Sequence, residues 1–95
     1  MEAKDVKHSK FDVEKIIYET KYFAIAYGVW ENRDKLLGFR WSGETNDDVG
    51  YPKLFGNPVW FVIPEELTVT FVKSLLDEKK GVKKDQIIEL LRELL

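Results

Sequence analysis

The alternation of bulky and small side chains is clearest in residues 22–31, YFAIAYGVWE. The odd-numbered positions up to Val29 are bulky and apolar, and the even-numbered positions are small residues flanked by Tyr22 and Trp30. Successive side chains of a strand point to opposite faces. The segment therefore predicts a strand whose bulky face meets the helices and whose other face is a shallow trough.

A second alternating segment follows at residues 35–42, after a polar connection at residues 32–34. One of its faces carries the large apolar residues Leu37, Phe39 and Trp41. The two segments predict an antiparallel hairpin, in which Gly28 and Gly38 could face each other.

Residues 11–20, FDVEKIIYET, fit either a strand or a helix. The spacing of Val13, Ile16 and Ile17 matches an amphipathic helix that has Asp12 as its N-cap. The segment is also rich in β-branched and aromatic residues, which favour a strand. We predict a strand at residues 14–20, because the polar residues after it then form a turn, and the helix remains the alternative.

Residues 50–64, GYPKLFGNPVWFVIP, hold all three prolines of the chain. Within them, residues 59–63 are exclusively β-branched or aromatic, which is typical of a central strand buried on both faces. Trp60 and Phe61 then point to opposite faces, and we predict that both are largely buried. One ring should meet the helices, and the loop at residues 43–58 should fold over the other.

That loop is long. About seventeen residues, 42–58, separate two predicted strands, whereas connections in compact domains usually have about four to six. Long connections are typically functional or ordered by their own packing. The segment is therefore a candidate for a functional region.

The last third of the chain predicts two helices, at residues 65–79 and 83–94. The first carries an apolar stripe formed by Leu67, Phe71 and Leu75. Gly81 marks a short connection, so the pair forms an αα-hairpin. The whole pattern predicts an α+β fold, a small antiparallel sheet of about four strands with a C-terminal αα-hairpin packed on one face.

With 95 residues, of which 44% are hydrophobic, the chain is sufficient for one core. We expect a single globular domain at residues 11–95. Residues 1–10 are polar and show no periodicity, which predicts a flexible N-terminal tail. His8, the only histidine, lies in this tail and is expected to be solvated.

Composition narrows the chemistry. The absence of cysteine excludes disulfides, thiolate chemistry and cysteine-based zinc sites. No apolar run reaches membrane-spanning length, and residues 1–10 lack the hydrophobic segment of a signal peptide. We therefore expect a cytoplasmic protein with no membrane contact.

Catalytic and metal-binding patterns are weak. The acidic residues Glu44, Asp47 and Asp48 lack the ligand spacing and the closing glutamate of a calcium loop. No recognised nucleophile, phosphate-binding or dinucleotide motif occurs in the sequence. We predict no catalytic activity, no metal and no cofactor.

Rings and cations gather in and beside the long loop, at Arg40, Trp41, Tyr51, Lys53 and Phe55. Such residue types dominate protein–protein contacts. The alternative for Trp41 and Phe55, and the one favoured for these two rings, is that they pin the loop onto the sheet. We therefore predict a small interaction or regulatory module that binds a protein partner through residues 42–58 and the sheet face. The apolar pair Leu94 and Leu95 adds homodimer formation as a further hypothesis.

The alternative function is single-stranded nucleic-acid binding. Arg40 and Lys53 would contact phosphates while the neighbouring rings stack on bases. The net charge of −2 is spread evenly along the chain, and this lack of a basic excess makes nucleic acid the less favoured partner.

Overall fold

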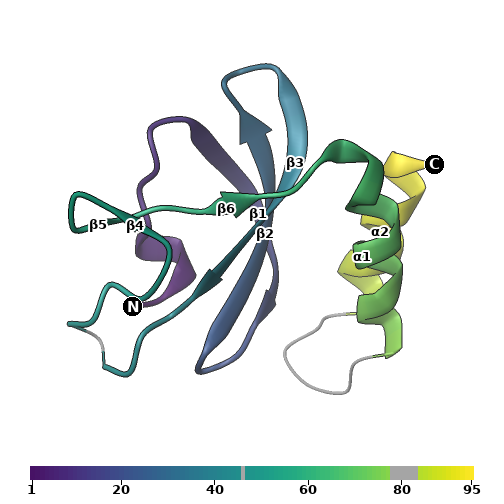
Figure 1. The fold of residues 1–95 in the computed structure, drawn as a ribbon. Helices are drawn as coiled ribbons and strands as arrows, with labels where there is room; N and C mark the ends of the chain where they lie inside the picture. Colours follow the sequence, from purple (N-terminus) through teal and green to yellow (C-terminus); the bar gives the residue numbers. More distant parts are fainter. Residues whose placement is uncertain (46, 78–83) are drawn as a thin grey trace.

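The computed structural model describes residues 1–45, 47–77 and 84–95 and shows an antiparallel sheet with helices on one face (Figure 1). The sheet has the order β1-β2-β3-β6, with the bounds Phe11–Glu19 (β1), Phe23–Trp30 (β2), Asp34–Trp41 (β3) and Phe61–Val62 (β6). The helical segments are Glu65–Leu67 (η2), Thr68–Ser74 (α1), Leu75–Asp77 (η3) and Lys84–Leu94 (α2). The predicted α+β fold with four strands is confirmed. The turn predicted at Gly81 lies outside the described residues.

β1 is a strand, and two bulges explain why its sequence also fits a helical period. Its register against β2 shifts between Val13 and Lys15 and again between Ile16 and Tyr18. Each bulge inserts one extra residue. Val13 and Ile16 therefore reach the same face three positions apart, and Ile17 turns to the opposite face.

Gly38 leaves room for two rings against the centre of the sheet. It lies opposite Ala26 in β2, so it does not pair with Gly28 as the sequence had suggested. A Cβ atom at Gly38 would lie 2.8 Å from the ring of Phe11 and 3.1 Å from Cβ of Trp60. The trough predicted on this face is thus filled by aromatic side chains.

The sheet carries a hydrophobic core on each face. The bulky face of β2 meets the helices as predicted, in a cluster that includes Ile25, Tyr27, Leu37, Val72, Ile87 and Leu90. The opposite face holds a second cluster, formed by Ala3, Val6, Phe11, Ala24, Ala26 and Trp60. Apolar surface is therefore removed from water on both sides of β2, which makes β2 the centre of the fold.

Residues 1–10 pack on the sheet, in contrast to the flexible tail expected from the sequence. They contain the short helix Ala3–Asp5 (η1), and Ala3 and Val6 are buried. The backbone N–H of Ala3 donates to the carboxylate of Glu19 at 2.9 Å. Burial of Ala3 and Val6 on the trough of β2 therefore anchors the segment, together with the hydrogen bond of 2.7 Å from the N-terminal ammonium of Met1 to the carbonyl oxygen of Ser42.

α1 turns a different side to the sheet than the predicted stripe. Thr68, Val72 and Leu75 are buried, whereas Leu67 and Phe71 lie at the margin and are partly exposed. The flanking segments η2 and η3 are 3₁₀-helical, and these tighter turns change the angular spacing of side chains. The buried positions therefore lie one residue beyond the predicted stripe at Thr68 and Val72, and they rejoin it at Leu75, which is buried as predicted.

The long loop is ordered by its own hydrogen bonds. Trp41 and Tyr51 exchange two backbone hydrogen bonds, of 2.6 and 3.0 Å. Lys53–Leu54 (β4) and Asn57–Pro58 (β5) then form a small hairpin. This hairpin lies on the side of the N-terminus, away from the helices (Figure 1). Trp60 packs in a cluster with residues of the N-terminal segment, so that segment takes the covering role expected for the loop.

β6 is an edge strand, although the sequence predicted a central one. Trp60 is 3% exposed, as predicted, but Phe61 is 62% exposed. The prediction that both rings are buried is therefore wrong for Phe61. Phe71 of α1 contacts Phe39 on β3, with ring centroids 5.3 Å apart, and Phe61 lies one strand further out.

Candidate protein-binding surface

Trp41 and Tyr51 are exposed neighbours at the end of β3. Their backbones pair directly, so their side chains leave the sheet on the same face. The ring of Trp41 packs edge-on against Phe23, with centroids 4.9 Å apart, while 56% of the residue remains exposed. One side of the Trp41 ring thus packs against Phe23, and the other side is exposed to solvent.

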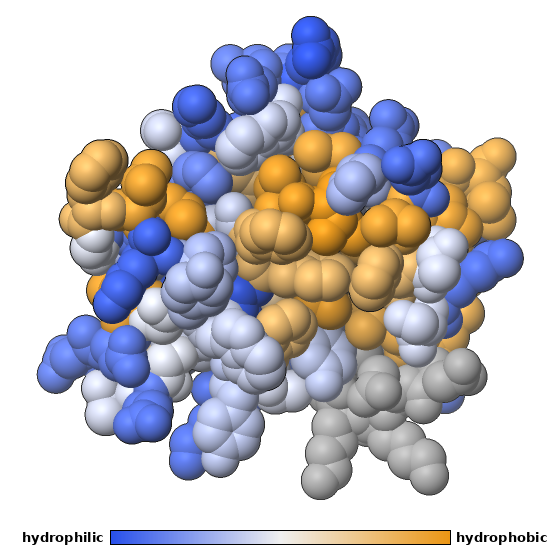
Figure 2. All heavy atoms as spheres, in the orientation of Figure 1, coloured by the Kyte–Doolittle hydropathy of each residue, from blue (hydrophilic) through white to orange (hydrophobic). Residues whose placement is uncertain are grey.

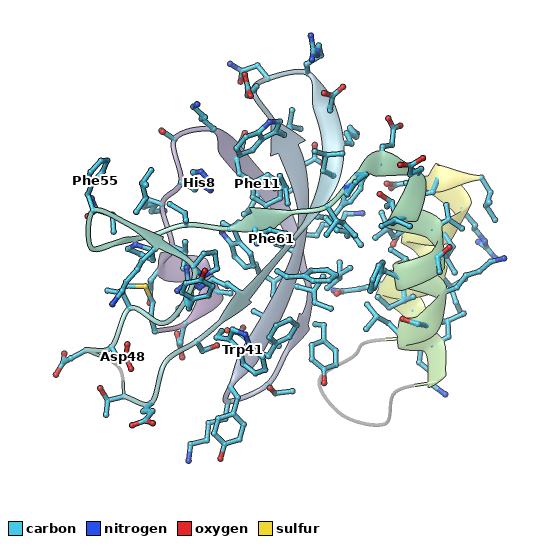
Figure 3. The ribbon with its side chains drawn as sticks, viewed as in Figure 1. His8, Phe11, Trp41, Asp48, Phe55 and Phe61 are labelled. Atoms are coloured by element: carbon cyan, nitrogen blue, oxygen red, sulfur yellow. The ribbon has the colours of Figure 1, made fainter. Side chains whose placement is uncertain are left out.

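Phe61 and Phe71 continue this exposed area toward the helices. Phe61 lies opposite Phe39 in the sheet, and Phe39 packs edge-on against Phe71. Phe61 and Trp41 are diagonal neighbours across β6 and β3, because Trp41 stands two residues beyond Phe39. Figure 3 shows Phe61 and Trp41 on this part of the molecule.

We call Trp41, Tyr51, Phe61 and Phe71 the aromatic face. More than a third of each residue is exposed to solvent. Figure 2 shows a hydrophobic area over β6 that extends toward the helices. Exposed apolar patches bounded by polar residues are characteristic of interaction sites. The arrangement offers a partner large, rigid rings that lose little conformational entropy on binding.

The backbone of this edge is largely closed to strand pairing. Val59 donates to Pro52 and Ile63 donates to Leu37, so odd-numbered residues turn inward and even-numbered residues turn to the outer edge. At outer positions, prolines 58 and 64 have no N–H. The N–H of Trp60 donates to Nδ1 of His8 at 3.0 Å. The edge therefore presents side chains more than backbone donors.

These prolines are also the signal that sequence reasoning missed. Proline is confined to the edges of sheets, and Pro58 and Pro64 bracket the segment VWFVI six positions apart. Their presence argued for an edge strand, and hence for one exposed ring. Phe61 was for this reason not among the predicted binding residues, whereas Phe71 and His8 were missed because their surroundings depend on contacts between distant parts of the chain.

Arg40 is not part of the surface. Only 2% of the residue is exposed, and its guanidinium donates to the carbonyl oxygen of Val59 at 2.7 Å and to that of Val49. Burial lowers the pKa of Arg40 from its ordinary value. The residue ties the middle of the long loop, at Val49, and the segment that follows the loop, at Val59, to β3. It therefore positions the surface and does not touch a ligand.

Lys53 and Phe55 are exposed, as a binding role requires, but they belong to the β4–β5 hairpin. Phe55 stands at the tip and is 95% exposed. Phe55 and Gly56 both have positive φ, +53° and +80°. The structure thus brings Trp41 and Tyr51 into one surface and carries Phe55 to a separate projection (Figure 3).

Charge differs between the two ends of β6. Lys53 lies on the hairpin that leads into the strand, and Glu65 and Glu66 follow directly after it, all exposed. On the hairpin side, backbone N–H groups of Gly50 and Glu44 hold the pKa of Asp48 below its usual range. The hairpin end of the aromatic face therefore carries Lys53 and the carboxylate of Asp48, and the helix end carries the carboxylates of Glu65 and Glu66.

A cleft of about 630 Å³ separates the hairpin from the N-terminal segment. Trp30, Leu54, Phe55 and His8 contribute to its lining, with Lys7 and Lys10 beside them. Burial, followed by the charge of Lys10, lowers the pKa of His8 from its ordinary value. A neutral His8 keeps Nδ1 available as the acceptor for Trp60.

Within residues 1–45, 47–77 and 84–95, no three His, Asp or Glu side chains are grouped as metal ligands. In the same part of the chain, no helix is long and apolar enough to cross a membrane. Comparisons with protein-family models, with curated proteins and with solved structures gave no match. Functional inference therefore depends on the surface described above.

Proposed function

We propose that this protein is a small protein-binding module without catalytic activity, and that it binds its partner through the aromatic face. The observation that carries the proposal is the exposure of Phe61 beside Trp41 and Phe71. Burying a phenylalanine side chain contributes about 1.5–3 kcal/mol. A domain with two well-filled cores leaves this gain unused unless a partner covers the ring.

Side-chain contacts, and not strand addition, are the proposed mode of binding. The outer edge of β6 is blunted by two prolines and by the hydrogen bond from Trp60 to His8. A partner would therefore be recognised by rings inserted against Trp41, Tyr51, Phe61 and Phe71. We also propose a cytoplasmic location, since two apolar cores stabilise this domain without disulfides.

Protein is favoured over single-stranded nucleic acid as the partner. The nucleic-acid alternative relied on Arg40 and Lys53 for phosphate contacts, and Arg40 is buried. Glu65 and Glu66, next to the aromatic face, would repel phosphates. Titration with single-stranded oligonucleotides at low salt should accordingly leave the tryptophan fluorescence unchanged.

Selection from a random-peptide display library tests the proposal. The unmodified protein serves as bait, and Phe61→Lys serves for counter-selection because a charge at this position opposes apolar docking. Leu95→Lys is a matched control, since Leu95 is also exposed but lies at the far end of α2. Enriched peptides should bind the unmodified protein and the control but not Phe61→Lys. Peptides that bind all three proteins equally would remove the aromatic face as the binding site.

A further inference from the structure

We propose that the partner of the aromatic face is a second copy of this chain, joined about a two-fold axis that passes through β6. The inference rests on the proposed function and specifies its partner. Most homo-oligomers are two-fold dimers, and such an interface must be complementary to itself. The β6 region meets this condition in shape, in apolar character and in charge.

The shape argument begins with the positions of the hairpin and α1. The β4–β5 hairpin lies on one side of β6 and α1 lies on the other (Figure 1). A half-turn about an axis that crosses β6 at a right angle, in the plane of the interface, exchanges these two sides. Each hairpin would therefore extend over α1 of the second copy, and the two Phe61 rings would meet near the axis.

The hairpin tip supplies the second argument. Positive φ at both central residues of a two-residue hairpin turn strongly favours Asn-Gly or Asp-Gly. Here the first position is Phe55, with φ +53°, a conformation in which a bulky side chain is strained. A strained and fully exposed ring contributes nothing to a single copy. Across the two-fold axis it would pack beside Phe71 and Leu67, which are partly exposed.

Charge supplies the third argument. The half-turn brings the start of one β6 to the end of the other. Lys53 of each copy would then approach Glu65 and Glu66 of its partner, while the aromatic face between them carries no charge. Opposite charges at the rim of an interface fix orientation and suppress wrong registers. A dimer in which the two β6 strands ran in the same direction would instead place like charges together.

The closed edge explains why association should stop at two copies. Strand addition at an open edge can continue without limit. Prolines 58 and 64 and the capped N–H of Trp60 disfavour strand addition here, so the expected contacts are those between rings about one axis. Such an isologous contact uses the same surface on both copies and closes on itself.

Sedimentation equilibrium from about 1 to about 500 µM is the first test, because dimer formation depends on concentration. The unmodified chain should form a dimer. Phe61→Lys should weaken it roughly 30-fold or more, as expected for a central interface ring. Leu95→Lys should leave the dimer unchanged. Phe55→Asp, at an exposed turn that tolerates Asp, should weaken it without loss of folding by circular dichroism.

Charge exchange is the sharper test. Lys53→Glu alone, and Glu65→Lys with Glu66→Lys, should each weaken the dimer about threefold to tenfold, since rim charges contribute modestly. An equimolar mixture of these two variants should recover a heterodimer of near-original affinity, because the opposite charges meet again. Recovery would not occur if these side chains acted only within one copy.

Two results would overturn the inference. One is a chain that remains monomeric at all concentrations. The other is a dimer that Phe61→Lys leaves intact and Leu95→Lys dissociates, which would assign self-association to the end of α2. If the chain is monomeric and peptides still bind in a Phe61-dependent manner, the second copy is excluded and the proposed function stands.

Discussion

Trp60 and Phe61 are adjacent in the chain, and their surroundings are opposite. Trp60 packs with Phe11, Ala3 and Val6 on the face away from the helices. Phe61 points to the helix side but lies at the edge of the sheet, where 62% of it remains exposed. Both rings are large and apolar, and they stand at the start of β6. The difference shows that burial is decided by the segment available to cover each face, and not by the residue itself.

Truncation of the two rings should therefore have very different consequences. Trp60→Ala should lower the free energy of unfolding by about 3–5 kcal/mol, because it leaves a cavity between β2 and the N-terminal segment. Phe61→Ala should lower it by less than about 1 kcal/mol, as is usual for exposed positions. Urea denaturation of both variants in dilute solution measures the contrast. Equal losses would mean that Phe61 is buried in the single copy.

Arg40 and Arg33 extend the comparison from rings to cations. Arg40→Ala should destabilise the domain by about 2 kcal/mol, because the carbonyl groups of Val49 and Val59 lose a charged donor in a buried site. Arg33 forms an exposed ion pair with Asp34 at 3.5 Å, and Arg33→Ala should change stability by about 0–1 kcal/mol. Hydrogen exchange should also show faster opening of residues 49–59 in the Arg40 variant only. Loss of stability in both variants to the same degree would contradict the positioning role of Arg40.

His8 makes the stability of the cluster around Trp60 sensitive to pH. Its pKa is lower in the folded protein than in the unfolded chain, because burial and Lys10 disfavour the imidazolium. The unfolded chain therefore binds more protons below about pH 6.5. Stability should be complete above this pH and should decline as the pH falls through the folded pKa, because a proton on Nδ1 removes the acceptor for Trp60.

His8→Asn is the matched variant, since its amide oxygen can accept the same hydrogen bond without titrating. Thermal unfolding would be measured for both proteins between pH 7.5 and pH 5. The stability of the variant should decline less over this range, because the carboxylates titrate in both proteins and only the unmodified protein has His8. An identical decline in both proteins would exclude His8 as the titrating group.

Much of the fold could be predicted from residue pattern alone. The alternation in residues 22–31 and 35–42 identified β2 and β3, because one face of each strand is uniformly bulky. The position of β6 at the edge of the sheet could not be inferred from its composition, since the side chains of VWFVI suit a central strand and an edge strand equally well. Only the spacing of Pro58 and Pro64 distinguishes the two, through the donors that proline lacks.

The candidate site was predictable in part. Trp41, Tyr51, Lys53 and Phe55 were candidate binding residues and are exposed, because they belong to a loop and to the end of a strand. Arg40 was assigned to the surface by residue type, whereas its position in β3, opposite the buried Ala24, places it on the covered face away from the helices. The role of His8 could not be predicted, because it depends on a contact with Trp60 across fifty-two positions of the chain.

The most direct test compares Trp60 with Trp41, which reports on the aromatic face. The protein would be labelled with 5-fluorotryptophan, and the three ¹⁹F resonances assigned with single Trp→Phe variants. The change in shift between H₂O and D₂O measures the exposure of each ring. We predict that in dilute solution Trp41 shows a large solvent shift and Trp60 almost none, and that the Trp41 shift declines as concentration rises and a second copy covers it. Equal solvent shifts for Trp41 and Trp60 in dilute solution would contradict the account.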